Sequence, residues 1–182
     1  MDAAGVEMVP DIGPCVAEAE PARHGVVALE LQPKKVVVGD VDADGVSDVV
    51  VASDWVGLVV WYKGLPAGGL ERSQVLTAEA PSVLCLALGD VDGNGRNDVV
   101  AGLGGDTDAV VWYRNLEPAG LFSSPIIVSR LANNVGSVAV VDLDSDGRAD
   151  IVMAGFSSPL LFWVAGVDGA GSFSAERIIS TA

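Results

Sequence analysis

Short apolar runs of about five residues follow one another along the chain, separated by breaks rich in Gly and Asp. The first runs, KVVVGD, DVVVAS and VVWYKG, lie between residues 35 and 64 and are rich in Val. Runs of this length and composition are typical of β-strands, whereas an amphipathic helix needs an apolar stripe with a period of about 3.6 residues. No segment shows such a stripe, so the pattern predicts an all-β fold.

The apolar pattern repeats about every fifty residues. Trp61, Trp112 and Trp163 occupy the similar runs VVWYKG, VVWYRN and LLFWVA, so that successive Trp residues are 51 positions apart. Around each Trp the pattern predicts four strands. The first two flank an Asp-rich loop, the third carries the Trp, and the fourth follows a Gly-rich turn. A repeated four-stranded unit is the signature of a β-propeller blade.

The repeat divides the chain into three blades, at approximately 25–78, 79–129 and 130–182. The run GVVALE at 25–30 resembles the fourth strand of an earlier blade, and we expect the aperiodic leader at 1–24 to be poorly ordered. Propellers have about 4 to 8 blades, so three blades do not close a ring. The pattern therefore predicts a partial β-propeller, and we expect either a fragment of a larger propeller or self-association.

Three Asp-rich loops follow the pattern D-x-D-x-[DN]-G-x-x-D. We call them loop one (residues 40–48), loop two (90–98) and loop three (142–150), and number their positions one to nine. Side-chain oxygens at positions one, three, five and nine and the carbonyl at position seven can converge on one cation, while Gly at position six permits a sharp turn. The candidate metal ligands are Asp40, Asp42, Asp44, Val46 and Asp48; Asp90, Asp92, Asn94, Arg96 and Asp98; and Asp142, Asp144, Asp146, Arg148 and Asp150.

An all-oxygen ligand set of this kind suits Ca²⁺, and the loops predict up to three calcium ions. Zinc would need His or Cys, and an EF-hand would need flanking helices and a Glu at position twelve, where this chain has Val51, Ala101 and Met153. The alternative is a set of Asp-rich β-turns with solvated carboxylates. Loop two carries Asn94 in place of a carboxylate, so we expect it to be the weakest site.

The formal net charge of −15 argues against nucleic acid and anionic membrane surfaces as partners, because both attract basic patches. No apolar run reaches 18 residues, so we expect no membrane insertion. The N-terminal segment MDAAGVEMVPDIGP has neither the basic nor the apolar region of a signal peptide. Of the two cysteines, Cys85 lies in an apolar run and is expected to be a buried free thiol; a Cys15–Cys85 disulfide is the alternative.

With these motifs in place, residues 25–182 resemble the FG-GAP/VCBS-type repeats of calcium-binding β-propellers, which also build the propeller of integrin α subunits. The matching features are the DxDxDGxxD loop, the following DVV or DIV strand, the VVWY strand and the closing DGAGSFSAERIIS. The resemblance implies calcium at the three loops and an extracellular or cell-surface location. A literal FG-GAP string and a signal peptide are missing, and the blades are fewer than the usual seven.

The function expected from these features is that of a non-catalytic, calcium-binding module for adhesion or ligand binding. Trp55, between the second and third strands, is the candidate residue for stacking on a ligand, which would be protein or carbohydrate. The alternative is a carbohydrate-binding or carbohydrate-active propeller. The only histidine, His24, lies in the leader, so a His-dependent catalytic triad is not expected.

Overall fold

The computed structural model describes residues 33–53, 57–77, 82–131, 134–156 and 160–181. The described residues form strands, turns and loops and contain no helix, which confirms the all-β prediction. Three features of the sequence lie outside them: the leader with Cys15, the run at 25–30, and Trp55.

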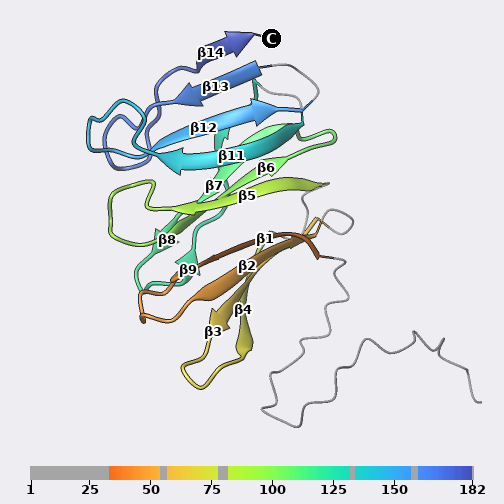
Figure 1. The fold of residues 1–182 in the computed structure, drawn as a ribbon, viewed down its shortest axis with the longest axis vertical. Helices are drawn as coiled ribbons and strands as arrows, with labels where there is room; N and C mark the ends of the chain where they lie inside the picture. Colours follow the sequence, from red (N-terminus) through yellow and green to blue (C-terminus); the bar gives the residue numbers. More distant parts are fainter. Residues whose placement is uncertain (1–32, 54–56, 78–81, 132–133, 157–159, 182) are drawn as a thin grey trace, which may run out of the picture.

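The described residues form three four-stranded antiparallel sheets and one two-stranded hairpin, and each four-stranded sheet is one blade (Figure 1). Blade one has the strand order β1-β2-β3-β4, blade two has β5-β6-β7-β10, and blade three has β11-β12-β13-β14. The bounds are Pro33–Gly39 (β1), Asp48–Ser53 (β2), Val59–Gly64 (β3), Leu70–Thr77 (β4), Val83–Gly89 (β5), Asp98–Leu103 (β6), Ala109–Tyr113 (β7), Ile126–Ser129 (β10), Val135–Val141 (β11), Asp150–Gly155 (β12), Leu160–Val164 (β13) and Arg177–Thr181 (β14).

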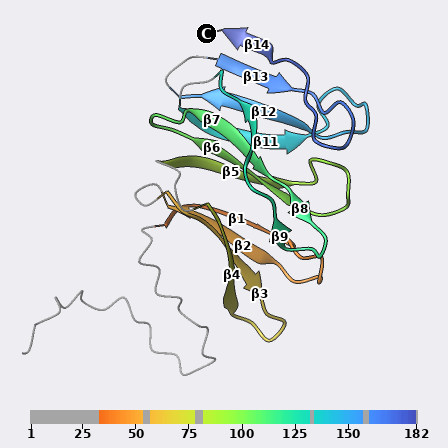
Figure 2. The same cartoon turned by 180° about the vertical axis from the view of Figure 1, so that it is seen from behind.

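A small hairpin of β8 (Asn115–Leu116) and β9 (Leu121–Phe122) interrupts blade two between its third and fourth strands. Figure 2 shows this hairpin from behind, beside the first blade. The blades follow one another along the molecule, with the first strand of each beside the first strand of the next. This arrangement is the predicted partial β-propeller.

The three blades share one register. The strands that flank the Asp loops begin their pairing at Gly39–Asp48, Gly89–Asp98 and Val141–Asp150. The third-strand tryptophans pair with Val50, Val100 and Val152 of the second strands. Because every blade repeats this register, the three Asp loops lie along the same side of the molecule, on the left in Figure 1.

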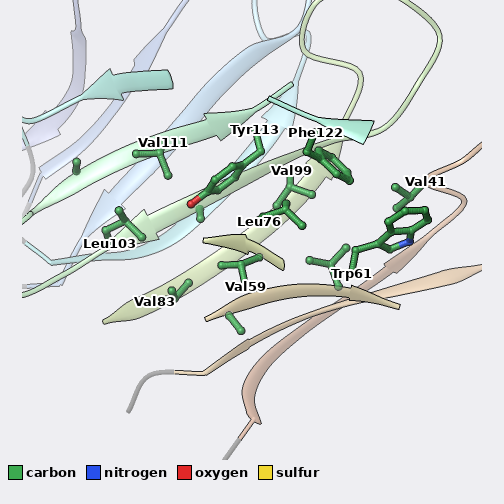
Figure 3. Packing of buried hydrophobic residues seen from close by; sticks show 14 residues of the cluster. Val41, Val59, Trp61, Leu76, Val83, Val99, Leu103, Val111, Tyr113 and Phe122 are labelled. Carbon is green, nitrogen blue, oxygen red and sulfur yellow. The ribbon is translucent and has the colours of Figure 1, made fainter. Parts of the chain in front are cut away.

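The main apolar core lies between the blades. Trp61 of blade one packs with Phe122 of blade two edge to face, with ring centroids 6.2 Å apart, among Val, Leu and Tyr side chains of both sheets (Figure 3). Trp112 and Phe173 repeat the arrangement between blades two and three, at 6.0 Å. Because a tryptophan recurs at this position in every unit, the sequence predicts the same kind of core around Trp163. Its side chain is only half-buried, because within the described residues no further blade lies against it.

Two glycines make these contacts possible. Gly120 and Gly171 have φ angles of 87° and 97°, and a Cβ on either would lie 2.5 Å or 2.1 Å from the six-membered ring of Trp61 or Trp112. Any side chain there would collide with an indole ring and would also adopt a strained backbone conformation. Each Gly-x-Phe segment therefore fits over the Trp of the preceding blade.

Candidate metal centre

The carboxylate at position one fixes the shape of each Asp loop. In loop one, Asp40 accepts hydrogen bonds from the backbone N–H groups of Asp44 (3.2 Å) and Gly45 (2.9 Å). Asp90 and Asp142 accept the corresponding bonds from the residues at positions five and six of their loops, at 2.7 to 3.1 Å. The loop thus closes on its own first residue.

The turn itself depends on the glycine at position six. Gly45, Gly95 and Gly147 have φ angles of 84°, 83° and 84°, and a Cβ would meet nothing within 4 Å at any of them. Space is therefore available, and it is the left-handed backbone conformation that selects glycine. The residue at position five then accepts a hydrogen bond from the N–H of position seven, at 2.8 to 2.9 Å in all three loops.

The carboxylate at position nine is fully buried and joins the loop to the third strand. Asp48 accepts hydrogen bonds from the backbone N–H groups of Val41 (2.8 Å) and Gly64 (2.7 Å). Asp98 and Asp150 make the equivalent pairs of bonds in the other blades. Position nine therefore has a structural task that the sequence did not indicate, and its assignment as a metal ligand stays a prediction.

Burial also changes the acidity of one of these groups. Burial raises the pKa of Asp98 to about 6, and the hydrogen bond from the backbone N–H of Asn115 only partly offsets that effect. A carboxyl with this pKa keeps its proton in the folded protein at mildly acidic pH, where an exposed Asp is ionised.

The three loops each gather carboxylates that could hold a metal ion. Each group offers carboxylate oxygens within 4.8 Å of one another, and the groups are Asp40, Asp42 and Asp48; Asp90, Asp92 and Asp98; and Asp142, Asp144 and Asp146. Position three is the member least used by the loop backbone. Among the described residues, Asp42 and Asp144 accept no hydrogen bond from the backbone, and Asp92 accepts a long one of 3.3 Å from the N–H of Asn94.

Basic side chains approach two of the three groups from the end of the third strand. Lys63 donates to Asp42 and Asp44, and its hydrogen bond is the main reason why the pKa of Asp44 is lowered. Arg114, at the matching position of blade two, pairs with the buried carboxylate of Asp92. Blade three has Ala165 at this position, and the cations near loop three are Arg148 at 2.8 Å from Asp146 and the more distant Arg177.

The next blade along the chain forms one wall of loops one and two. A Cβ at Gly120 would lie 3.4 Å from the Asp42 side chain, and one at Gly169 would lie 3.5 Å from the backbone oxygen of Asp92. Asp92 is consequently only 5% exposed. Loop three has no such wall within the described residues, and its three gathered carboxylates are all exposed.

Sequence reasoning missed the residues that tie loop one to blade two. The fully buried Asn115 donates from Nδ2 to the backbone oxygens of Val41 (2.7 Å) and Asn97 (2.9 Å) and accepts from the N–H of Gly120. Asn97 in turn donates to the backbone oxygen of Asp40 at 2.8 Å. A signal existed, because the position of Asn115 is occupied by Gly64 and Gly166 in the other two blades.

The candidate ligands are therefore placed unequally. Positions one and three are gathered in every loop, position nine joins them in loops one and two, and position five joins them in loop three. Of the position-seven residues, Val46, Arg96 and Arg148, the backbone N–H groups bond within the loop, while Arg96 directs its guanidinium to Glu117 at 2.9 Å. Trp55 lies outside the described residues.

A hollow lies at the ends of β1, β5 and β11 that are opposite the Asp loops. It encloses about 550 Å³ and is lined by residues of all three blades: Lys34, Lys35, Leu84, Asn134, Gly136 and Phe156. Phe156 is 86% exposed, which makes it the most exposed large apolar side chain among the described residues. Cys85, by contrast, is a buried free thiol that donates to the backbone oxygen of Val135 at 3.2 Å, as expected.

The fold and the repeated loops agree with what the chain is similar to. A lectin of Agrocybe aegerita that specifically recognises non-reducing terminal N-acetylglucosamine has a similar structure, with a TM-score of 0.55 and 25% sequence identity. The similarity covers 80% of this chain and 38% of the lectin, so the chain spans well under half of the lectin's length. No curated protein matches the chain. The part of the chain that the structure describes contains no helix of the length and apolarity needed to cross a bilayer.

The loops and their flanking strands also match a family model. The model of the FG-GAP-like repeat matches twice, over residues 40–101 and 90–153, and each match runs from one Asp loop through the next. Together the matches cover more than half of the chain. The chain therefore belongs to the FG-GAP-like repeat family.

Proposed function

We propose that this chain is a non-catalytic calcium-binding β-propeller module of an extracellular or cell-surface protein that binds a ligand or mediates adhesion. The observation that carries the calcium assignment is that all three blades contain the same hydrogen-bonded Asp loop. In each loop the backbone hydrogen bonds hold the loop closed and bring acidic side chains within 4.8 Å of one another. Without a cation, carboxylates at this spacing repel one another or take up protons.

The donor set fits a hard cation. Every side chain gathered in the three loops offers carboxylate oxygens, and none offers nitrogen or sulfur. Ca²⁺ accepts about 6 to 8 oxygens with flexible geometry, which suits ligands on a tight loop supplemented by water. Asp42, Asp92 and Asp144 at position three would be the principal ligands, because their oxygens are the least committed to the loop backbone. The loops would bind calcium to hold the first and second strands of each blade together.

Loop two would bind calcium most weakly. It carries Asn94 at position five, where loops one and three carry Asp44 and Asp146, so it offers one carboxylate fewer. Arg114 pairs with Asp92 as Lys63 pairs with Asp42 in loop one, so the missing carboxylate leaves loop two with the lower negative charge of the two. An affinity of about 10⁻⁴ to 10⁻³ M, as in extracellular calcium modules, would agree with an extracellular location.

Calorimetric titration of calcium into the chelator-treated chain, with thermal unfolding alongside, tests the proposal. We expect three binding events and a higher melting temperature, since calcium at ten times its Kd adds about 1.4 kcal/mol per site. Asp144→Asn should remove one event. Asp106→Asn, which removes the same charge from an exposed turn outside the loops, should leave all three. Absence of binding heat and of stabilisation would refute the calcium assignment.

A carbohydrate ligand is the second candidate, and similarity to the Agrocybe aegerita lectin is the observation that favours it. The hollow beside Phe156 has the exposed ring and the polar rim that sugars use for stacking and hydrogen bonding. Titration with N-acetylglucosamine, monitored by NMR, tests this candidate. Shifts that saturate in the wild type and vanish in Phe156→Ala would support it, and no shifts at millimolar sugar would count against it.

A further inference from the structure

The interface between neighbouring blades is built twice from the same two halves. One half is the Trp face of a sheet, on which Val50, Val59, Trp61 and Leu76 of blade one are buried, as are Val100, Val110 and Trp112 of blade two. The other half is the face of the next sheet with its Gly-x-Phe segment, which covers the indole ring. One interface used twice shows that the two halves are complementary.

Within the part of the chain that the structure describes, the Trp half of blade three has no partner. The shared register makes Val152, Leu161 and Trp163 the counterparts of Val100, Val110 and Trp112. All three counterparts are half-buried or exposed, with Leu161 at 37%, and the neighbouring Ile179 is 48% exposed. Within the described residues, the Trp163 ring meets the guanidinium of Arg177, 4.9 Å from its centroid, in place of a Gly-x-Phe segment.

Among the described residues, the complementary half on blade one also has no partner. Leu70 pairs with Gly64, three residues after Trp61. Phe122 and Phe173 pair with Asn115 and Gly166, which follow Trp112 and Trp163 by the same three residues, so Leu70 occupies the same place in the fold. Leu70 is 36% exposed, whereas Phe122 is buried. Beside it, Val36 and Val38 are more than 60% exposed and Gly69 has open space around it. A hollow of about 390 Å³, lined by Val36, Val49, Val51 and Leu70 among others, lies in this face.

We propose that blade three of one copy binds blade one of a second copy head to tail, with Leu70 and Val36 of the second copy covering Trp163 and Leu161 of the first. The described residues of each copy expose one of each half, and both halves are apolar surfaces in a chain with a formal net charge of −15. An interface between two different faces leaves a free half at each end of the pair. Such contacts continue into a ring if the rotation closes and into a filament if it does not.

One residue of the open Trp face differs from the internal interfaces. Blades one and two have Gly39 and Gly89 at the end of the first strand, and a Cβ at Gly89 would lie only 2.5 Å from a methyl group of Val140 in blade three. Blade three has Val141 at this position, where Val38 of the incoming copy would take the place of Val140. The contact between copies must therefore be looser at this point than the contact between blades.

Sedimentation velocity of the full chain from about 1 to 200 µM tests the proposal, in calcium and separately in EDTA so that its outcome does not depend on calcium binding. The wild type should associate with rising concentration. Trp163→Ala should weaken association at least ten-fold, as loss of a central aromatic contact does. Val141→Gly should tighten it about three-fold or more. The control Ile127→Ala removes an exposed side chain from the outer strand of blade two and should change nothing.

Orientation is tested by disulfide trapping in a Cys15→Ser background. Trp163→Cys on one copy should cross-link to Leu70→Cys on another, and neither variant alone should form a dimer. A wild type that stays monomeric to 200 µM would overturn the proposal. So would equal association of Trp163→Ala and Ile127→Ala, or cross-links between two Trp163→Cys copies. Melting temperatures of all variants confirm that each one is folded.

Discussion

The buried carboxylate of Asp48 accepts a hydrogen bond of 2.7 Å from the backbone N–H of Gly64, sixteen residues further along the chain. Its other oxygen accepts from Val41 at 2.8 Å, so one side chain connects the start of the Asp loop to the end of the third strand. Asp98 and Asp150 do the same in their blades. The Asp loops are thus built into the sheets even before any cation is considered.

This arrangement predicts that Asp48→Asn destabilises the protein. An amide has one accepting oxygen, and its NH₂ group would face a backbone N–H inside the protein, which costs about 2–3 kcal/mol of the free energy of unfolding. Asp44→Asn is the control, because Asn94 already makes the equivalent backbone bond in loop two, at 2.9 Å. We expect Asp44→Asn to destabilise the protein much less than Asp48→Asn does, since the pair of Asp44 with Lys63 is exposed. Urea unfolding in EDTA measures both, and equal losses would contradict the role of position nine.

Gly120→Ala tests the packing of a glycine against Trp61. The new methyl group would adopt a φ of 87° and would collide with the indole ring. Gly69→Ala also puts a side chain on a backbone with a positive φ, of 102°, but the new methyl group would meet no other atom because the surroundings of Gly69 are open. Gly120→Ala should therefore lower the free energy of unfolding by about 1–3 kcal/mol more than Gly69→Ala does. Denaturant unfolding at low protein concentration gives the comparison. Equal free energies of unfolding for the two variants would show that the Trp61 ring can move aside without loss of stability.

Lys63→Met should strengthen calcium binding at loop one. The ammonium group pairs with Asp42 and Asp44, so an incoming cation has to displace it. Its removal should lower the calcium Kd of this loop about three- to ten-fold and should let the pKa of Asp44 rise again. Lys34→Met removes the same charge at the far end of β1 and should change the Kd less than about two-fold. Calorimetric titration measures both, and an unchanged or weaker site in Lys63→Met would show that Lys63 does not compete.

Cys85 should react with a thiol reagent only after unfolding. Burial raises the pKa of the Cys85 thiol to about 11, and its side chain is 6% exposed. In a Cys15→Ser background at pH 8, labelling by a chromogenic disulfide should be at least a hundred-fold slower for the native chain than in urea. Because the unfolded thiol ionises near pH 8.5, Cys85 stabilises the fold below that pH, and this contribution is lost as the pH rises towards 11. Fast labelling of the native chain would contradict the burial.

The strands and loops were predictable because their signals are local and occur three times. The Val-rich runs and the Asp pattern each fix a short stretch of backbone, and the period of 51 residues between tryptophans confirmed the alignment. The Asp loops were recognised for the same reason, since positions one to six interact mostly with one another.

The remaining features depend on contacts between residues distant in sequence. Asn115 reaches Val41 across 74 positions, and Lys63 reaches Asp42 across 21, so neither contact follows from a local pattern. The exposure of Trp163 was missed because the repeat makes the three tryptophans look equivalent. Their surroundings differ only because the neighbour that each one meets belongs to a different blade.

The wall that a blade provides for the Asp loop of the preceding blade would link cation binding thermodynamically to the packing of the blades. Gly120 lies against Asp42 and Gly169 against Asp92, so the affinity of either loop for an ion would depend on whether the next blade is packed against it. Linkage is reciprocal, so a blade that improves the affinity of a loop is itself held more tightly when the loop is filled. Loop three is open on this side, so its affinity for calcium would rise when a second copy packs against blade three. Calcium would then favour longer head-to-tail assemblies of the chain.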